Sequence, residues 1–337
     1  RGTQMGFRKV DTIFFGGGTP SLMGPERLGK ILDRLGKYFI IEENSEITFE
    51  ANPETVDLSE WQLYRESGFN RVSIGVQSLQ ENELKACGRI HSPQKAIEAV
   101  VGAQKAGFER INVDLMFGIP EQTFDSFQRT VGEVLALPIE HLSIYGLQIE
   151  EGTVFSSWEE QGKLILPSEE TVVQMYDWLL EYLPANGFGR YEISNFAKPG
   201  GESRHNLKYW HYQPYLGFGS GACGFDGEVR QENPERVSEY VSWVKQLQAN
   251  PQKIAYEKLT SNQKMAEFCF MGLRTVEGIL LKDFYNYFGV YLLDVYGESI
   301  KKALKEEWVW VTENRIYPTP LGLKWNNRLG ELFLLYG

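Results

Sequence analysis

The first half of the chain alternates short apolar runs with longer segments in which apolar residues recur at helical spacing. The apolar runs predict five strands, at Thr12–Phe15, Glu46–Ala51, Arg71–Gly75, Arg110–Leu115 and His141–Leu147. The segments between them predict helices at Pro25–Tyr38, Ser59–Ser67, Pro93–Ala106 and Asp125–Leu135. Such a repeat of strand and helix is typical of a parallel α/β sheet, either doubly wound or curled into a barrel.

The second half of the chain has a different pattern. A predicted helix over Ser168–Leu183 precedes a segment rich in glycine and aromatic residues that shows little periodicity. Further helices are predicted at Val237–Gln248, Asn262–Leu273, Leu281–Phe288, Leu292–Leu304 and Leu321–Leu335. A strand pair that turns at Glu313 and Asn314 completes a small winged-helix-like module. Because 337 residues exceed what one core usually holds, we expect two domains, at 1–233 and 234–337.

The composition narrows the class of protein. A formal net charge of −11 argues against a nucleic-acid-binding surface, which requires clustered Lys and Arg. No apolar run approaches the roughly 18 residues that would span a bilayer. The first ten residues also lack the apolar core of a signal peptide. The sequence therefore predicts a soluble, cytoplasmic protein that does not bind nucleic acid.

Glycine or polar residues follow several predicted strands at their carboxyl ends. Gly16–Pro20 follow the first strand, Glu50 ends the second, and Gln77 and Asp114 end the third and fourth. Polar groups from several strands at one rim are typical of the active site of a βα-barrel. Two simpler interpretations stay open, since a strand-end carboxylate often caps the next turn and the glycines suit a sharp turn into a helix.

The three consecutive glycines fit neither common nucleotide motif. No Lys follows them as in a phosphate-binding loop, and Ser21 stands where the dinucleotide fingerprint requires its third glycine. A glycine backbone does let polar ligand atoms approach its amide and carbonyl groups closely. The guanidinium group of Arg89 can bind a carboxylate through two N–H groups. Together with the strand-end residues it could bind an amino acid joined to a nucleoside.

The segments FFGGGTPS, FEANPE, RVSIGVQS, ACGRIHS and NVDLMFGIPEQT resemble the S-adenosylmethionine-binding motifs of radical SAM proteins of the oxygen-independent coproporphyrinogen III oxidase group. The resemblance covers nearly the whole chain. It implies a partial (β/α) barrel that lacks its first strand, followed by the small helical domain. It also implies S-adenosylmethionine contacts at Gly17, Gly18, Thr19, Glu50, Gln77, Arg89 and Asp114. Arg89 is expected at the ligand's carboxylate, Gln77 and Asp114 at its ribose, and the Gly16–Thr19 backbone at its methionyl part.

The element RHNLKYW resembles that of the haem chaperones of this group more than that of the oxidases. The resemblance implies that His205 binds haem iron, with Tyr209, Trp210 and Tyr212 over the apolar macrocycle. His211 is the nearby competitor for the iron. Without the resemblance, a hydrogen-bonded packing role is the commoner one for a histidine in this position. His91 and His141 are expected to be structural or to lie next to the cofactor.

Proteins of this group also carry a Cys-x3-Cys-x2-Cys element upstream of the glycines, which holds a four-iron, four-sulfur (4Fe-4S) cluster. This chain has Cys87, Cys223 and Cys269, whose spacing fits no metal motif, and we expect them to be reduced and mostly buried. We expect the sequence to be an N-terminally shortened form of a complete protein that holds the cluster. Natural loss of the element is the alternative.

The resemblance implies a haem chaperone that binds S-adenosylmethionine and haem and delivers haem to membrane-associated respiratory proteins. Peripheral contact with a membrane is compatible with that role. The alternative function is an enzyme of porphyrin biosynthesis, an oxygen-independent coproporphyrinogen III oxidase that decarboxylates its substrate by radical chemistry. A third interpretation is a degenerate barrel kept only as an interaction scaffold, which binds neither S-adenosylmethionine nor haem.

Overall fold

The computed structural model describes residues 9–249 and 257–334. The chain forms two compact units, each with its own core. Among the described residues, one unit contains residues 9–190 together with Ser194–Ser203, and the other contains Tyr191–Ile193, residues 204–249 and residues 257–334. The expected domain boundary after residue 233 stays a prediction, because compactness alone does not establish an independently folding domain.

A seven-stranded sheet is the framework of the first unit. Its strands lie in the order β1-β2-β3-β4-β5-β7-β6. They are β1 (Lys9–Phe15), β2 (Ile40–Ala51), β3 (Arg71–Gln77), β4 (Arg110–Phe117), β5 (His141–Gly146), β6 (Gly189–Arg190) and β7 (Asn195–Ala197). Strands β1 to β5 pair in parallel and in chain order, while β7 pairs antiparallel with β5 and β6. Connections between parallel strands of one sheet are almost always right-handed. Because β1 to β5 follow one another in chain order, the connecting helices lie on the same face of the sheet.

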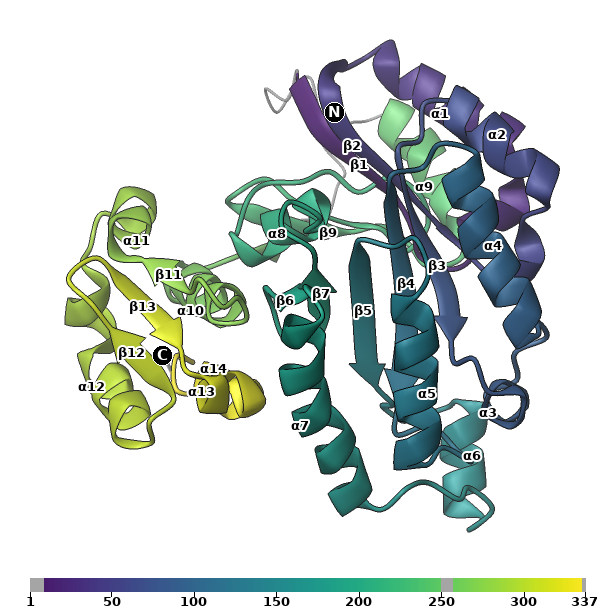
Figure 1. Ribbon diagram of the computed structural model, residues 1–337. Helices are drawn as coiled ribbons and strands as arrows, with labels where there is room; N and C mark the ends of the chain where they lie inside the picture. The colour runs from purple at the N-terminus through teal and green to yellow at the C-terminus, as the bar shows by residue number, and fades with distance from the viewer. Residues whose placement is uncertain (1–8, 250–256, 335–337) are drawn as a thin grey trace. The chain divides into compact units, whose positions relative to one another are not determined.

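Helices cover that outer face. They include α1 (Pro25–Gly36), α2 (Leu58–Glu66), α4 (Pro93–Lys105), α5 (Phe124–Leu135) and α7 (Glu169–Ala185). The short helices α3 (Glu81–Ala86) and α6 (Val154–Glu160) belong to the segments that follow β3 and β5. Figure 1 shows α1, α2, α4 and α5 following one another along the outer side of the sheet. Apolar side chains of the strands pack against these helices, with Phe49, Trp61 and Phe127 fully buried in the shared core. The predicted partial (β/α) barrel is confirmed, and the doubly wound alternative is excluded.

The inner face of the same strands is polar. In β3, Val72 and Ile74 belong to the apolar core, while Arg71 and Ser73 alternate with them. The other parallel strands repeat this alternation with Glu46, Thr48 and Glu50 in β2, Asn112 and Asp114 in β4, and His141 and Ser143 in β5. Most of these polar side chains are buried. The half-barrel therefore presents hydrogen-bonding groups on its inner side, where many barrels are filled by branched apolar residues.

The second unit consists of short strands and helices. Its first part contains α8 (Arg204–Trp210), a sheet of β8 (Cys223–Phe225), β9 (Val229–Glu232) and β10 (Glu257–Lys258), and helix α9 (Val237–Ala249). Its second part contains helices α10 (Ser261–Gly272), α11 (Leu281–Phe288) and α12 (Leu292–Lys305). An antiparallel sheet accompanies them, formed by β11 (Ile279–Leu280), β12 (Val309–Val311) and β13 (Arg315–Pro318). The predicted hairpin at Glu313 and Asn314 and the helical character of this part are confirmed.

One prediction for the second unit is wrong. The helix expected over Leu321–Leu335 is two short helices, α13 (Pro320–Lys324) and α14 (Asn326–Glu331), because Trp325 leaves the helical conformation with φ −102° and ψ 28°. Buried Asn326 donates to the Leu273 carbonyl at this break, so a tertiary contact sets the chain direction. The expected end of that helix, at Leu335, lies outside the described residues. The segment around HNLKYW, which showed no clear periodicity, forms α8.

Across residues 9–249 and 257–334, we find no helix with the length and apolarity required to cross a membrane.

Candidate functional site

The glycine turn joins β1 to a short 3-10 helix, η1 (Pro20–Met23), at the carboxyl end of the sheet. Gly17 and Gly18 have φ angles of +81° and +127°, which disfavour any residue with a Cβ. Nothing lies within 4 Å of where a Cβ on either would stand, so this side of the turn is open. At Gly16, by contrast, a Cβ would lie 2.7 Å from the Phe14 ring and 3.0 Å from Glu50 Oε1. The turn is therefore open to a ligand on one side and packed against Glu50 on the other.

Glu50, at the end of β2, has a carboxyl group with a raised pKa. It accepts a hydrogen bond from the Gly17 backbone N–H at 3.2 Å. Burial raises the pKa of Glu50 to about 7, the nearby charge of Asp114 adds to the rise, and the Gly17 N–H opposes it. A cation bound beside Glu50 would favour its ionised form. This carboxyl is therefore suited to receive a positively charged group.

Asp114, on β4, is the second carboxyl of the site. Its oxygens accept hydrogen bonds from Ser73 Oγ at 3.0 Å and from Asn112 Nδ2 at 2.7 Å. Burial raises the pKa of Asp114, although hydrogen bonds from Ser143, Ser73 and Asn112 and the charge of Arg71 act in the opposite direction. The hydrogen bonds fix the direction in which the carboxyl group points.

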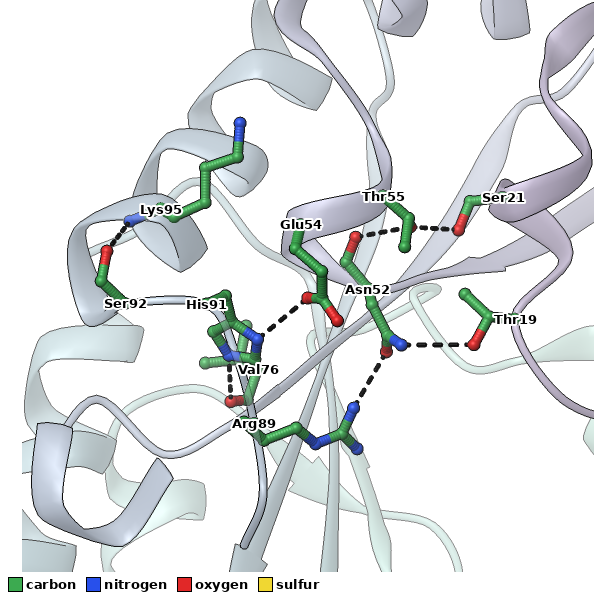
Figure 2. Close-up of polar contacts among 10 residues, drawn as sticks. All are labelled: Thr19, Ser21, Asn52, Glu54, Thr55, Val76, Arg89, His91, Ser92 and Lys95. Atoms are coloured by element: carbon green, nitrogen blue, oxygen red, sulfur yellow. Dashed lines mark hydrogen bonds and ion pairs between the residues drawn. The ribbon is translucent and has the colours of Figure 1, made fainter. Parts of the chain in front are cut away.

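Asn52 links two of the predicted ligand contacts (Figure 2). Its Nδ2 donates to Thr19 Oγ1 at 3.2 Å, and its Oδ1 accepts from Arg89 Nη1 at 3.2 Å. Thr55 Oγ1 donates to the Asn52 carbonyl at 2.8 Å and lies 2.5 Å from Ser21 Oγ. Asn52 was not among the predicted site residues, although it stands in the FEANPE segment that carried the resemblance.

Gln77, at the end of β3, is almost fully buried and has a left-handed φ of +68°. Its side-chain end lies close to that of Asn52 above Gly75. A Cβ built on Gly75 would stand 2.9 Å from Asn52 Oδ1 and 3.1 Å from Gln77 Nε2. Glycine at position 75 therefore leaves room for both amides.

The predicted site residues thus come together at one rim of the first unit, at the carboxyl ends of the strands. The residues in question are Gly17, Gly18, Thr19, Glu50, Gln77, Arg89 and Asp114. The arrangement offers two carboxyl groups, a guanidinium group, an amide and an open backbone turn. This donor and acceptor set fits an amino acid with its ammonium and carboxylate groups, attached to a hydroxyl-bearing nucleoside. Contact of these residues with S-adenosylmethionine stays a prediction.

His205 lies on α8, in the second unit. Its Nε2 lies 2.8 Å from the Tyr209 hydroxyl, one helical turn further on. Burial raises the pKa of Tyr209 to about 12, and its ring packs edge-on against Tyr215 at 4.6 Å. Ligation of haem iron by His205 stays a prediction. Iron binding through Nε2 requires that the Tyr209 hydroxyl first give up this hydrogen bond.

The aromatic residues expected beside His205 lie in different surroundings. Trp210 stacks on the guanidinium group of Arg274, whose Cζ lies 4.8 Å from the ring centroid. Tyr212 is a core residue, because its ring is buried against Phe225 and Phe268. The expectation that Tyr212 covers a macrocycle is therefore wrong for this structure.

The other three histidines differ in burial. His91 and His141 are buried and hydrogen-bonded, as a structural role requires. Burial and the charges of Arg71 and Arg110 hold the pKa of His141 well below its usual range. His211, the predicted competitor of His205, is exposed.

The cysteines of this chain do not fit an iron–sulfur cluster. Cys87 follows α3, Cys223 lies in β8 and Cys269 is buried in α10. Burial raises the pKa of each thiol. In the described part of the chain, no three His, Cys, Asp or Glu side chains gather as metal ligands would. The described residues therefore offer no ligand set for such a cluster.

Two family models match the chain. Residues 3–134 match the radical SAM superfamily, and residues 259–325 match the HemN C-terminal domain. The radical SAM match covers strands β1 to β4 of the half-barrel and includes the glycine turn with its strand-end residues, so the first unit carries a radical SAM domain.

Curated relatives narrow this class. The "Heme chaperone HemW" of Lactococcus lactis is 35% identical over 97% of this chain and 85% of its own length, and that of Bacillus subtilis is 35% identical over 96% and 86%. The Escherichia coli protein of the same name is 33% identical over 97% and 85%. The chain belongs to the HemW family.

A solved structure supports the fold. Coproporphyrinogen III oxidase (HemN) from Escherichia coli, described as a radical SAM enzyme, superimposes with a TM-score of 0.82 over 98% of this chain and 79% of its own. At 21% sequence identity, this similarity shows a shared architecture and no more.

Proposed function

We propose that this protein is a haem carrier that binds haem through His205 and S-adenosylmethionine at the carboxyl ends of β1 to β4. The identity of 35% over 97% of the chain to a protein named "Heme chaperone HemW" is the observation that carries this proposal. The HNLKYW helix supports it, because one half-buried helical turn presents an imidazole and a phenol together. Imidazole is a common axial ligand of haem iron.

The S-adenosylmethionine site is proposed on the chemistry of the rim. Gly17 and Gly18 would meet the methionyl backbone, Glu50 its ammonium group and Arg89 its carboxylate. Gln77 and Asp114 would hold the ribose hydroxyls. When bound, the ligand supplies a sulfonium centre. The protein's own contribution is to bind it, to orient it and to neutralise its ammonium charge.

The proposed recipient of the haem is a membrane-associated haem protein of respiration, and the carrier is proposed to act from the cytoplasm. This part of the proposal rests on the resemblance to the haem-chaperone branch. Transfer is measurable as the loss of the carrier's haem spectrum when an apo-acceptor in membrane vesicles is added. A carrier that keeps its haem in the presence of such acceptors would contradict the delivery step.

A haemin titration tests the central claim. The Soret band of the wild-type protein is expected to shift from that of free haemin, and His205→Ala is expected to lose most of that shift. His211→Ala is the matched control, since it removes the exposed neighbouring imidazole. Circular dichroism of each variant establishes that it is folded. An unaltered Soret band in folded His205→Ala contradicts the proposal.

The oxidase alternative makes a different prediction. An oxidase converts coproporphyrinogen III to protoporphyrinogen IX under anaerobic conditions, whereas a carrier retains haem without turnover. The structural similarity to the Escherichia coli oxidase shows the fold alone, so it does not favour turnover. Formation of protoporphyrinogen IX would replace the carrier proposal, and failure to bind either ligand would favour an interaction scaffold.

A further inference from the structure

Gln77 is the central residue of a γ-turn that ends β3. Its φ is +68°, and the Ser78 N–H donates to the Val76 carbonyl, two residues back, at 2.9 Å. γ-Turns with positive φ are rare and strained. A residue with a Cβ persists in such a conformation only where its surroundings hold it there.

A second hydrogen bond to the same carbonyl comes from His91. Its Nε2 lies 3.2 Å from the Val76 oxygen, and the His91 side chain is fully buried. A carbonyl oxygen only accepts, so Nε2 must carry the hydrogen. His91 comes from the loop between α3 and α4, so this bond ties the strained turn to a separate segment of the chain.

The other ring nitrogen of His91 faces a carboxylate. Nδ1 lies 3.0 Å from Glu54 Oε2, in the segment after β2 that contains the short 3-10 helix η2 (Pro53–Thr55) (Figure 2). With Nε2 already a donor, this second bond requires a proton on either Nδ1 or the carboxyl group of Glu54. His91 therefore joins the end of β3 to the loop that follows β2.

The same loop carries Arg89, two residues before His91. Figure 2 shows the guanidinium group of Arg89 directed to Asn52 and the His91 ring directed to Glu54 and Val76. The loop is thus held at three points by two side chains. Loss of the His91 side chain would remove the support of the turn at Gln77. The loop that carries Arg89 would then be held only by the bond from Arg89 to Asn52 among these three contacts.

We propose that His91 is a positioning residue of the strand-end site, which holds Gln77 in its γ-turn and Arg89 over Asn52. Neither the family resemblance nor any predicted ligand contact assigned His91 this role. The identity of the ligand rests on the proposed function, whereas the positioning itself is a property of the ligand-free protein. Two measurements separate these claims.

Amide hydrogen exchange tests the positioning without ligand. The Ser78 amide is expected to exchange at least about tenfold faster in His91→Ala than in the wild-type protein, because the turn that engages it loses its support. Ser92→Ala is the matched control, since it removes the cap bond to the Lys95 amide at 3.2 Å and leaves Val76 and Glu54 untouched. Wild-type exchange at Ser78 in His91→Ala overturns the proposal, whether or not the protein binds S-adenosylmethionine.

A double-mutant cycle tests the effect on the ligand. His91→Ala is expected to weaken S-adenosylmethionine binding about tenfold, and His91→Gln to restore part of it, because an amide N–H can still donate to Val76. In the Gln77→Gly background, His91→Ala is expected to have a smaller effect, since glycine adopts this φ unaided and only the segment that carries Arg89 still loses a support. An equal loss in both backgrounds shows that His91 does not act through Gln77 and overturns the proposal. If wild-type protein binds no S-adenosylmethionine, the proposed function fails, and hydrogen exchange still decides the role of His91.

Discussion

The backbone N–H of Gly17 donates to Glu50 Oε2 at 3.2 Å, which joins two strand ends that lie 33 residues apart in the sequence. The same bond opposes the rise in the pKa of Glu50 that burial and Asp114 cause. The geometry of the glycine turn and the charge of the carboxyl group therefore depend on each other, because a protonated carboxyl is a weaker acceptor than a carboxylate.

Glu50→Gln is expected to stabilise the protein above pH 7. The pKa of Glu50 in the folded protein, about 7, lies above its ordinary value of 4.5, so folding favours the protonated form. Stability is therefore lost as pH rises from about 4.5 through about 7. The glutamine variant has no such loss, and its free energy of unfolding at pH 8 should be higher by up to about 3 kcal/mol. Urea denaturation at pH 5 and pH 8 measures the difference.

The control for this prediction is Glu26→Gln. Glu26 is exposed on α1 and pairs with Lys30 at 2.5 Å, a surface pair of little energetic weight. Its loss should leave the stability at pH 8 nearly unchanged. Equal stability of Glu50→Gln and wild-type protein at pH 8 contradicts the burial argument.

The affinity for S-adenosylmethionine is expected to fall as pH drops below 7. An ammonium group binds the ionised form of Glu50, so protonation of free Glu50 competes with the ligand. Affinity should decline towards tenfold per pH unit below about pH 6, and Glu50→Gln should bind weakly with little pH dependence over that range. Calorimetric titrations between pH 5 and pH 8 give the profile. A flat profile in wild-type protein would remove Glu50 from the ammonium site.

Much of the first unit could be predicted because its strands and helices have clear periodicity. The expected strand at Arg71–Gly75 and the helix at Pro93–Ala106 differ from the structure by one or two residues at their ends. The choice between a doubly wound sheet and a barrel depended on strand order, which local periodicity does not encode. The sequential order of β1 to β5 decided it.

The candidate site could be predicted as a group of strand-end residues but not as a hydrogen-bonded network. Sequence position indicates that Glu50 and Asp114 share a rim, since parallel strands end on the same side. It does not indicate that Asn52 bridges Thr19 and Arg89, or that His91 reaches Val76, because these contacts depend on side-chain directions in separate loops. Helix α8 was missed because seven residues are too short for a reliable helical period.

Gly75→Ala is expected to disturb both ligand binding and folding. The new Cβ would stand 2.9 Å from Asn52 Oδ1 and 3.1 Å from Gln77 Nε2, and both side-chain ends can move away. The move costs the Asn52 bridge to Arg89. Affinity for S-adenosylmethionine should fall at least about tenfold, with a loss of about 1 to 3 kcal/mol in stability. Equilibrium dialysis and thermal unfolding measure the two effects.

Gly132→Ala is the matched glycine control. Gly132 lies inside α5 with no atom within 4 Å of a Cβ, so alanine should raise stability by about 1 kcal/mol and leave affinity unchanged. Wild-type affinity in Gly75→Ala would show that the amides of Asn52 and Gln77 do not need their present positions for binding.

Tyr209→Phe is expected to strengthen haem binding. The Tyr209 hydroxyl lies 2.8 Å from His205 Nε2, so this nitrogen binds iron only after the hydrogen bond breaks. A hydrogen bond worth about 1 kcal/mol corresponds to a roughly fivefold gain in affinity for the phenylalanine variant. Tyr215→Phe is the control, because it removes a hydroxyl group from the ring that packs edge-on against Tyr209. Haemin titrations followed by the Soret band measure both. Weaker binding by Tyr209→Phe would mean that the hydroxyl supports the haem complex, and iron ligation through Nε2 would need another explanation.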